Sequence, residues 1–246
     1  MLEAGDVFGR NLPIEQKKAE VSLQAMAKMG YDAYNLGARE LIFGQEFITS
    51  QIKKNGIPLL CANVMLTEEG IPFATPYIIK DLKGVRIGII GLMSNLFIAP
   101  QHKAEDKAIL VRDFRQVASQ LIPELKKECQ LVIVLGHLTL DEAGELVEEI
   151  PGITAIILAW GMGAIDPPLE HGGTLILSAG TQGTHLGELY LDLARDGKLL
   201  SYDSTLTALD KKVPYDPEIA GLLSDNEFPY PTQNEPPLPE GELPKI

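Results

Sequence analysis

Apolar positions recur along the chain with two different periods, which predicts an α/β protein. Spacings of about four residues, as in Val21, Ala25 and Met29, are typical of a helix face. They predict helices over residues 15–29, 45–54, 113–128 and 141–149. Short apolar runs predict strands over residues 31–36, 57–64, 77–80, 85–92, 131–135, 154–158 and 174–178, and a hairpin over 188–193 and 198–207. Strands that alternate with helices and then give way to a hairpin indicate a mixed sheet.

Local signals define several ends of these elements. Gly30 and Asn55-Gly56 supply residues that stop a helix at low conformational cost, and Asp113 is a candidate N-cap. Pro123 lies inside the third predicted helix and should kink it or begin a fresh first turn.

The end of the chain differs in composition from the rest. Residues 226–246 contain six prolines among acidic and polar residues, which is too little apolar material for a core. We therefore expect one globular domain over residues 1–210 and a Pro-rich acidic tail over 211–246.

Charge narrows the classes of partner. The 246 residues include 34 acidic and 21 basic side chains, for a formal charge of -13, which disfavours nucleic acid and anionic membranes as partners. The stretch over residues 87–101, which is free of charged residues and histidine, is too short and too polar to cross a bilayer. The first residues do not have the pattern of a secretory signal, so we expect either that the protein stays inside the cell or that its beginning is missing.

Candidate chemistry gathers at strand ends, where α/β proteins place their functional loops. The segments are Glu3-Ala-Gly-Asp-Val-Phe-Gly9, Asn35-Leu-Gly-Ala-Arg-Glu-Leu41, Val132-Ile-Val-Leu-Gly-His-Leu138, Ile156-Ile-Leu-Ala-Trp-Gly-Met-Gly163 and Ser178-Ala-Gly-Thr-Gln-Gly-Thr-His-Leu-Gly187. Their order and spacing resemble the metallophosphatase domain of the bacterial 5'-nucleotidase family, one of the calcineurin-like metallophosphoesterases. The resemblance covers nearly all of the chain before the tail. It implies a four-layer α/β/β/α sandwich of two mixed sheets, here without its N-terminal strand.

The resemblance also implies a pair of divalent metal ions held by Asp, His and Asn side chains, which would activate a water for attack on phosphate. The family's first motif, Asp-x-His, would lie in the missing strand. Asp6 matches the metal-bridging carboxylate of the Gly-Asp motif, and His137 matches a metal ligand of the fourth motif. The third motif, Gly-Asn-His-Glu, is replaced by Gly37-Ala38-Arg39-Glu40, so a ligand and the catalytic histidine are absent.

The family's fifth motif is also replaced. Trp160 and Met162 stand at its two histidine positions, and neither side chain suits a hard divalent ion. Asp6 and His137 are the remnant metal positions. Since even one catalytic zinc usually needs three protein ligands, we expect no dinuclear centre and no catalytic residue.

Structural interpretations compete with each of these roles. His137 could be a strand-end histidine with a hydrogen-bonded ring, and Asp6 a turn or cap residue. Arg39 with Glu40 could form a surface or partly buried ion pair, or Arg39 could contact an anion in the old phosphate pocket as a substrate-binding residue. Trp160 would fill the space that the ions left.

Three functional hypotheses remain. The first is a non-catalytic structural or binding module with no cofactor. The second is an active metal-dependent phosphohydrolase with a rearranged or complemented site that uses manganese, zinc or cobalt. The third is that an upstream segment or a protein partner supplies the missing strand, without which the sheet edge near Leu2 and Leu36 should be uncovered. The resemblance leaves the compartment open, since family members commonly act in the periplasm or outside the cell.

Overall fold

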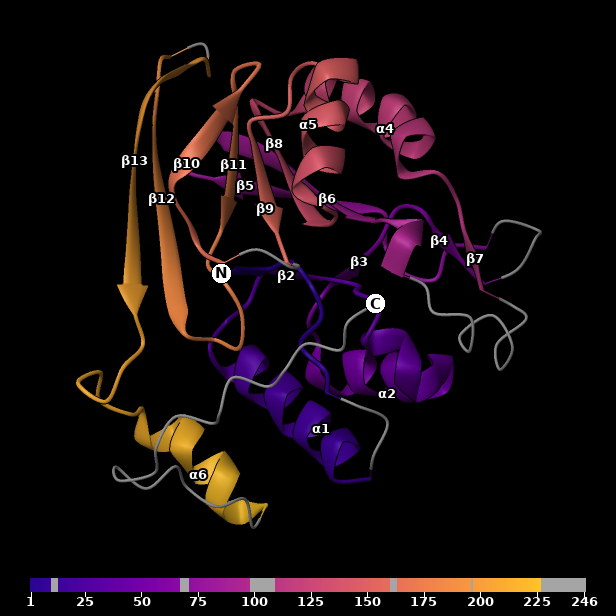
Figure 1. Cartoon of the computed structure of the whole chain (residues 1–246), viewed down its shortest axis with the longest axis vertical. Coiled ribbons are helices and arrows are strands. Elements are labelled where there is room, and N and C mark those ends of the chain that lie inside the picture. The colour runs from indigo at the N-terminus through magenta and orange to yellow at the C-terminus, as the bar shows by residue number, and fades with distance from the viewer. Residues whose placement is uncertain (10–12, 67–70, 98–108, 160–162, 196, 227–246) are drawn as a thin grey trace.

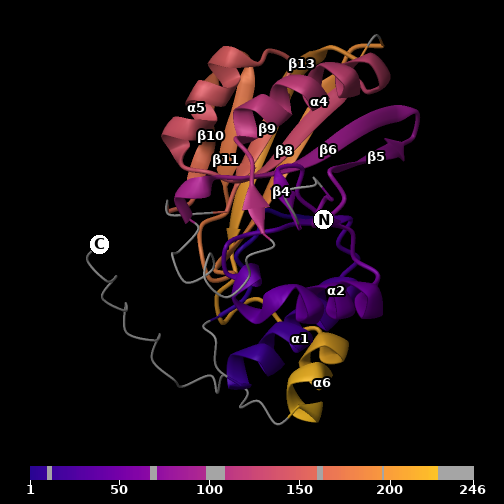
Figure 2. The same ribbon diagram turned by 90° about the vertical axis from the view of Figure 1, so that its right-hand side faces the viewer.

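The computed structural model describes residues 1–9, 13–66, 71–97, 109–159, 163–195 and 197–226. They form an α/β architecture in which helices flank two main sheets (Figures 1 and 2). Among these residues, no helix has the length and apolar character needed to cross a membrane.

The larger sheet has six strands in the order β10-β11-β9-β8-β6-β5. Its parallel centre consists of β6 (Val85–Met93), β8 (Leu131–His137), β9 (Ala155–Leu158) and β11 (Thr174–Ser178). The antiparallel edges are β5 (Tyr77–Leu82) and β10 (Ile165–His171). The connections from β6 to β8 and from β8 to β9 each contain a helix, as the crossover between parallel strands usually does.

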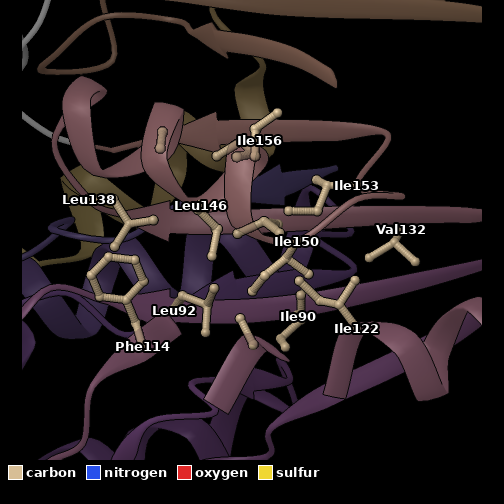
Figure 3. Packing of buried hydrophobic residues seen from close by; sticks show 14 of the residues in the cluster. Ile90, Leu92, Phe114, Ile122, Val132, Leu138, Leu146, Ile150, Ile153 and Ile156 are labelled. Atoms are coloured by element: carbon tan, nitrogen blue, oxygen red, sulfur yellow. The ribbon is translucent and has the colours of Figure 1, made fainter. Parts of the chain in front are cut away.

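Two amphipathic helices cover one face of this sheet (Figure 3). Helix α4 (Phe114–Glu128) begins at Asp113, whose carboxylate accepts from two backbone N–H groups, and α5 (Leu140–Glu149) begins with a capping box at Thr139. Their apolar faces pack on alternate residues of the strands, including Ile90, Leu92, Val132, Val134, Ile156 and Leu158. This face forms the largest cluster of fully buried residues in the described part of the molecule.

The smaller sheet has three parallel strands in the order β1-β2-β3, namely β1 (Leu2–Glu3), β2 (Ala33–Asn35) and β3 (Leu59–Leu60). Helices α1 (Pro13–Lys28) and α2 (Gly44–Asn55), with the short η1 (Glu40–Phe43), cover its outer face. Two further strands, β4 (Val64–Met65) and β7 (Leu110–Val111), pair beside it, and η2 (Asn95–Phe97) follows β6.

Buried asparagines tie the two sheets together. Asn35 at the end of β2 donates to the backbone carbonyls of Ala4 and Leu92, at 3.0 and 3.1 Å. Asn63 donates to the carbonyl of Met93 and accepts from its N–H. These hydrogen bonds hold the ends of the two sheets next to each other. The loops that follow those ends therefore lie side by side.

The last part of the described chain forms a long hairpin and a helix. Strands β12 (His185–Leu193) and β13 (Leu199–Ala208) pair antiparallel as a separate ribbon, as the hairpin prediction required. Helix α6 (Pro217–Asp225), capped by Asp216, lies beside α1 and carries the Glu218 partner of Lys28 (Figure 2). The apolar pattern predicted no element at residues 217–225, which form α6.

Several expectations about single elements were wrong. Helix α4 includes Pro123, so a fresh first turn does not begin there, and Ile122 and Leu125 on either side are buried in the core. Residues 57–64 split between β3 and β4 instead of forming one strand. Strand β10 was missed because it contains two prolines, which an edge strand tolerates. Leu36 is fully buried against the α1 and α2 side, so the expected exposure near Leu36 does not occur.

Candidate functional site

The site begins where β1 ends. Gly5 has a φ of +116° and Asp6 a φ of +64°, so the chain turns sharply away from the strand direction. Aspartate tolerates the left-handed region better than most residues, because its short polar side chain can bond locally. The turn places the Asp6 carboxylate over the carboxyl ends of the neighbouring strands.

A buried carboxylate holds this turn in place. Glu40 is fully buried and accepts from the backbone N–H groups of Asp6, Phe8 and Gly37, at 3.1, 3.2 and 2.8 Å. The approach is so close that a Cβ on Gly37 would lie 2.5 Å from the backbone nitrogen of Asp6, which explains the glycine. Glu40 thereby joins the loop after β1 to the loop after β2.

The Asp6 carboxylate contacts two other residues that were chosen from the sequence. One oxygen, Oδ2, lies 3.1 Å from Nε2 of His137 and 3.8 Å from Nε of Arg39. The other, Oδ1, accepts from the backbone N–H of Arg39 at 3.0 Å. The structure therefore brings together Asp6 and Arg39, from the loops after β1 and β2, and His137, from the end of β8.

His137 is the last residue of β8 and is fully buried. Its carbonyl accepts from the N–H of Ser94 at 2.9 Å, which fixes the end of β8 against the end of β6. The ring of Phe97 meets the imidazole edge to face, with centroids 4.5 Å apart. Nε2 of this ring is the atom that lies at ion-pair distance from the Asp6 carboxylate.

The pKa values of the two carboxylates of the site, Asp6 and Glu40, are shifted in opposite directions. Burial alone would raise the pKa of Asp6, but the hydrogen bond and charge of His137, together with Arg39, bring that pKa below its ordinary value. For Glu40, burial and the nearby charge of Asp6 raise the pKa, although its backbone donors oppose the shift. Asp6 is therefore the more firmly ionised of the two.

This constellation does not fit a catalytic metal ion. Within the described ranges, no three His, Cys, Asp or Glu side chains are grouped so that they could hold one. The Arg39 guanidinium brings a positive charge to the same oxygen that a cation would need, and Asp6 and His137 meet each other directly. Trp160 and Met162, which replace the family's histidines, lie outside the described residues.

The structure corrects one interpretation and adds residues that the sequence analysis missed. Glu40 does not pair with Arg39: it is a buried acceptor of backbone N–H groups, and Asp6 is the partner of Arg39. Glu40 matches the glutamate of the family's Gly-Asn-His-Glu motif, and this match could have identified it as part of the site. The role of Asn35 between the sheets had no such signal, because it depends on a contact between distant strands.

Comparisons with known proteins agree with the fold. The chain is 26% identical to a 5'-nucleotidase of Vibrio cholerae over 93% of its own length. Its fold superimposes on the calcineurin-like phosphoesterase YfkN of Bacillus subtilis with a TM-score of 0.75, over 92% of this chain and 82% of that chain, at 23% identity. The chain is a homologue of the bacterial 5'-nucleotidases with a calcineurin-like metallophosphatase fold. The predicted family and fold class are thereby confirmed.

The same comparisons limit what can be transferred to this 5'-nucleotidase homologue. It spans about half the length, 47%, of the Vibrio relative. The sulfate thiohydrolase SoxB of Thermus thermophilus shares the fold with a TM-score of 0.81, over 92% of this chain and 42% of that chain, at 17% identity. One fold thus carries enzymes that are named for different bonds, so function has to be argued from the site. No family model matches the chain.

Proposed function

We propose that this chain is a phosphoesterase-like domain that has lost metal-dependent hydrolysis and acts as a structural or binding module. The observation that carries the proposal is the direct contact between Asp6 and His137, 3.1 Å apart. The two groups lie at ion-pair distance from each other. No third His, Cys, Asp or Glu side chain is grouped with them among the described residues, and a catalytic metal usually needs at least three protein ligands.

Arg39 supports the same conclusion. Its backbone N–H and its guanidinium both engage the Asp6 carboxylate, where the resemblance places a metal-bridging ligand. A fixed positive charge there opposes a divalent cation, and it also supplies part of the charge that such a cation would have supplied. The Asp6, Arg39 and His137 cluster is thus balanced without a metal.

The test is metal analysis combined with an activity screen. We expect less than about 0.1 equivalent of manganese, zinc or cobalt after dialysis against each ion, since two protein donors rarely hold a catalytic metal. AMP, 2',3'-cyclic AMP and bis(p-nitrophenyl) phosphate should not be hydrolysed above the background set by Asp6→Ala. Stoichiometric metal together with turnover that Asp6→Ala removes would overturn the proposal.

A second candidate is an active phosphohydrolase whose site is completed by residues from elsewhere. A cavity of about 530 Å³ adjoins the site and is lined by Gly5, Asp6, Ala159 and Gly180, among others. It has room for further donor groups beside Asp6. Hydrolysis of the same substrates only after a second polypeptide is added, with one metal bound per complex, would favour this alternative over a non-catalytic module.

A further inference from the structure

The turn that follows β6 contains a buried polar side chain outside the cluster of Asp6, Arg39 and His137. Ser94 comes directly after Met93, the last residue of β6, and it is fully buried although the next two residues of the turn are exposed. Its N–H donates to the carbonyl of His137 at 2.9 Å. A buried hydroxyl needs hydrogen-bond partners, so the partners of Ser94 indicate what fixes this turn.

The hydroxyl of Ser94 acts both as a donor and as an acceptor. It donates to Oε1 of Glu142 at 2.6 Å and accepts from the N–H of Leu96 at 3.1 Å. The first bond is charge-assisted, which makes it short and strong. The second closes the turn locally, as serine side chains do when they bond to the backbone two residues further along. The hydroxyl therefore ties η2 to helix α5.

Glu142 also fixes the chain that leaves His137. Its Oε2 accepts from the N–H of Thr139 at 2.9 Å, and its own N–H donates to the Thr139 hydroxyl at 3.1 Å, which completes the capping box of α5. Leu138, between His137 and Thr139, is buried in the core that Figure 3 shows. The capping box occupies one carboxylate oxygen of Glu142, and Ser94 takes the other. One carboxylate thus connects the turn after β6 with the turn after β8.

Phe97 is the last residue of the turn that Ser94 begins. Its ring meets the imidazole of His137 edge to face, with centroids 4.5 Å apart and an angle of 75° between the planes. Nε2 of the same imidazole lies 3.1 Å from Oδ2 of Asp6. The imidazole therefore contacts both the aromatic ring and the carboxylate, and the place of the aromatic ring depends on the turn that carries it.

We propose that Ser94 and Glu142 are positioning residues for His137. The bond between the Ser94 hydroxyl and Glu142 fixes the turn after β6, the turn holds Phe97 against the imidazole, and this contact keeps Nε2 at the Asp6 carboxylate. These roles go beyond the proposed function, because they concern how the imidazole is held and not whether the site hydrolyses a phosphate ester.

The test is nuclear magnetic resonance of the imidazole groups in the whole chain, labelled at histidine. The chain has four histidines, and the spectrum of His137→Gln identifies the signals of His137 by their loss. In the unsubstituted protein we expect a nuclear Overhauser effect between His137 and an aromatic ring. Phe97→Leu should remove this effect and move the His137 signals, because it removes the ring current of the neighbour. If either change is absent, the ring contact does not form in solution and the proposal is wrong.

Ser94→Ala and Glu142→Gln break the proposed connection in two ways. Alanine lacks the hydroxyl, whereas glutamine removes the charge and keeps an acceptor oxygen for the capping box, so that α5 retains its start. Both variants should move the His137 signals in the direction of Phe97→Leu and weaken the Overhauser effect. Glu149→Gln, at the exposed far end of the same helix, is the matched control and should leave both unchanged. If neither Ser94→Ala nor Glu142→Gln moves the His137 signals, the proposal is overturned.

The double variant distinguishes one shared bond from two separate effects on stability. If Ser94 and Glu142 act through one bond, the double variant should move the His137 signals no further than the larger of the two single changes. Additive displacements would contradict the proposal. The Overhauser effect in the unsubstituted protein does not depend on how any variant folds. Metal analysis and turnover are measured separately from these spectra, so a failure here leaves the proposed loss of hydrolysis untouched.

Discussion

Ile156 and Ile157 are neighbours on β9, yet they face two different interiors. Ile156 is fully buried between the larger sheet and helices α4 and α5, where apolar side chains fill the space. Ile157 is only partly buried and faces a cavity between the two sheets. Apolar side chains fill the closed side, whereas the open side keeps a cavity that is lined by Ile157 and Glu3.

The largest effect that would test this difference comes from shortening the two isoleucines. Ile156→Ala should lower the free energy of unfolding by about 3–4 kcal/mol, because it opens a void in a filled core. Ile157→Ala should cost about 1 kcal/mol, since its side chain already adjoins empty space. Urea denaturation of both variants measures the difference. Equal losses would show that the cavity is packed in solution.

The second largest effect on the free energy of unfolding should come from changing Glu40, the buried acceptor that joins the loops of the site. Glu40→Gln keeps the shape of the side chain but replaces one acceptor oxygen with a donor, which then faces a backbone N–H. We expect a loss of about 2–3 kcal/mol in the free energy of unfolding. The same change at the exposed Glu46 should stay within about 0.5 kcal/mol. If the two variants are equally stable, Glu40 does not organise the site.

The free energy of unfolding should depend on pH through Glu3, which lies at the open edge of β1. The pKa of Glu3 is raised from 4.5 to about 7 in the folded protein, so the folded state binds more protons than the unfolded state between these values. Stability from this group is therefore complete below pH 4.5 and falls as the pH rises toward 7. Allowing for its partial exposure, we expect a fall of about 1–2 kcal/mol.

Glu3→Gln removes this titration, and urea denaturation at pH 5, 6 and 7 compares the two slopes. Glu40 contributes to both proteins in the same direction, so the difference between the slopes isolates Glu3. Parallel slopes would mean that Glu3 is solvated and that its place at the edge of β1 does not raise its pKa.

The smallest effect concerns the ionised carboxylate of the site. The pKa of Asp6 is lowered, so its contribution is present above its unfolded value near 3.8 and is lost as the pH falls through the folded value. Asp6→Asn should cost about 1 kcal/mol at pH 7, because the amide keeps some of the contacts. The gap should close in strongly acidic solution. A gap that stays constant from pH 7 to pH 2.5 would show that the charge of Asp6 contributes nothing.

The sequence predicted the fold better than the site. Period-four and strand patterns located all of α1, α2, α4 and α5, because each buries one face in a core. The pattern failed at β1, which is two residues long, and at β10, where prolines conceal an edge strand. Asp6, Arg39 and His137 were chosen from the sequence, and the structure brings them together. Their roles as remnant metal positions and as an anion contact stay predictions.

By itself the sequence determined which residues are available: an α/β pattern, a family resemblance, and a set of replaced motif positions that lack metal donors. Tertiary structure alone decided what these residues do to one another. Arg39 turned to Asp6 rather than to its neighbour Glu40, because Glu40 is drawn inward by three backbone N–H groups. The sequence predicted an uncovered edge near Leu2, but only the tertiary structure places β12 on the same cavity as that edge, since the two strands lie about 180 residues apart in the chain.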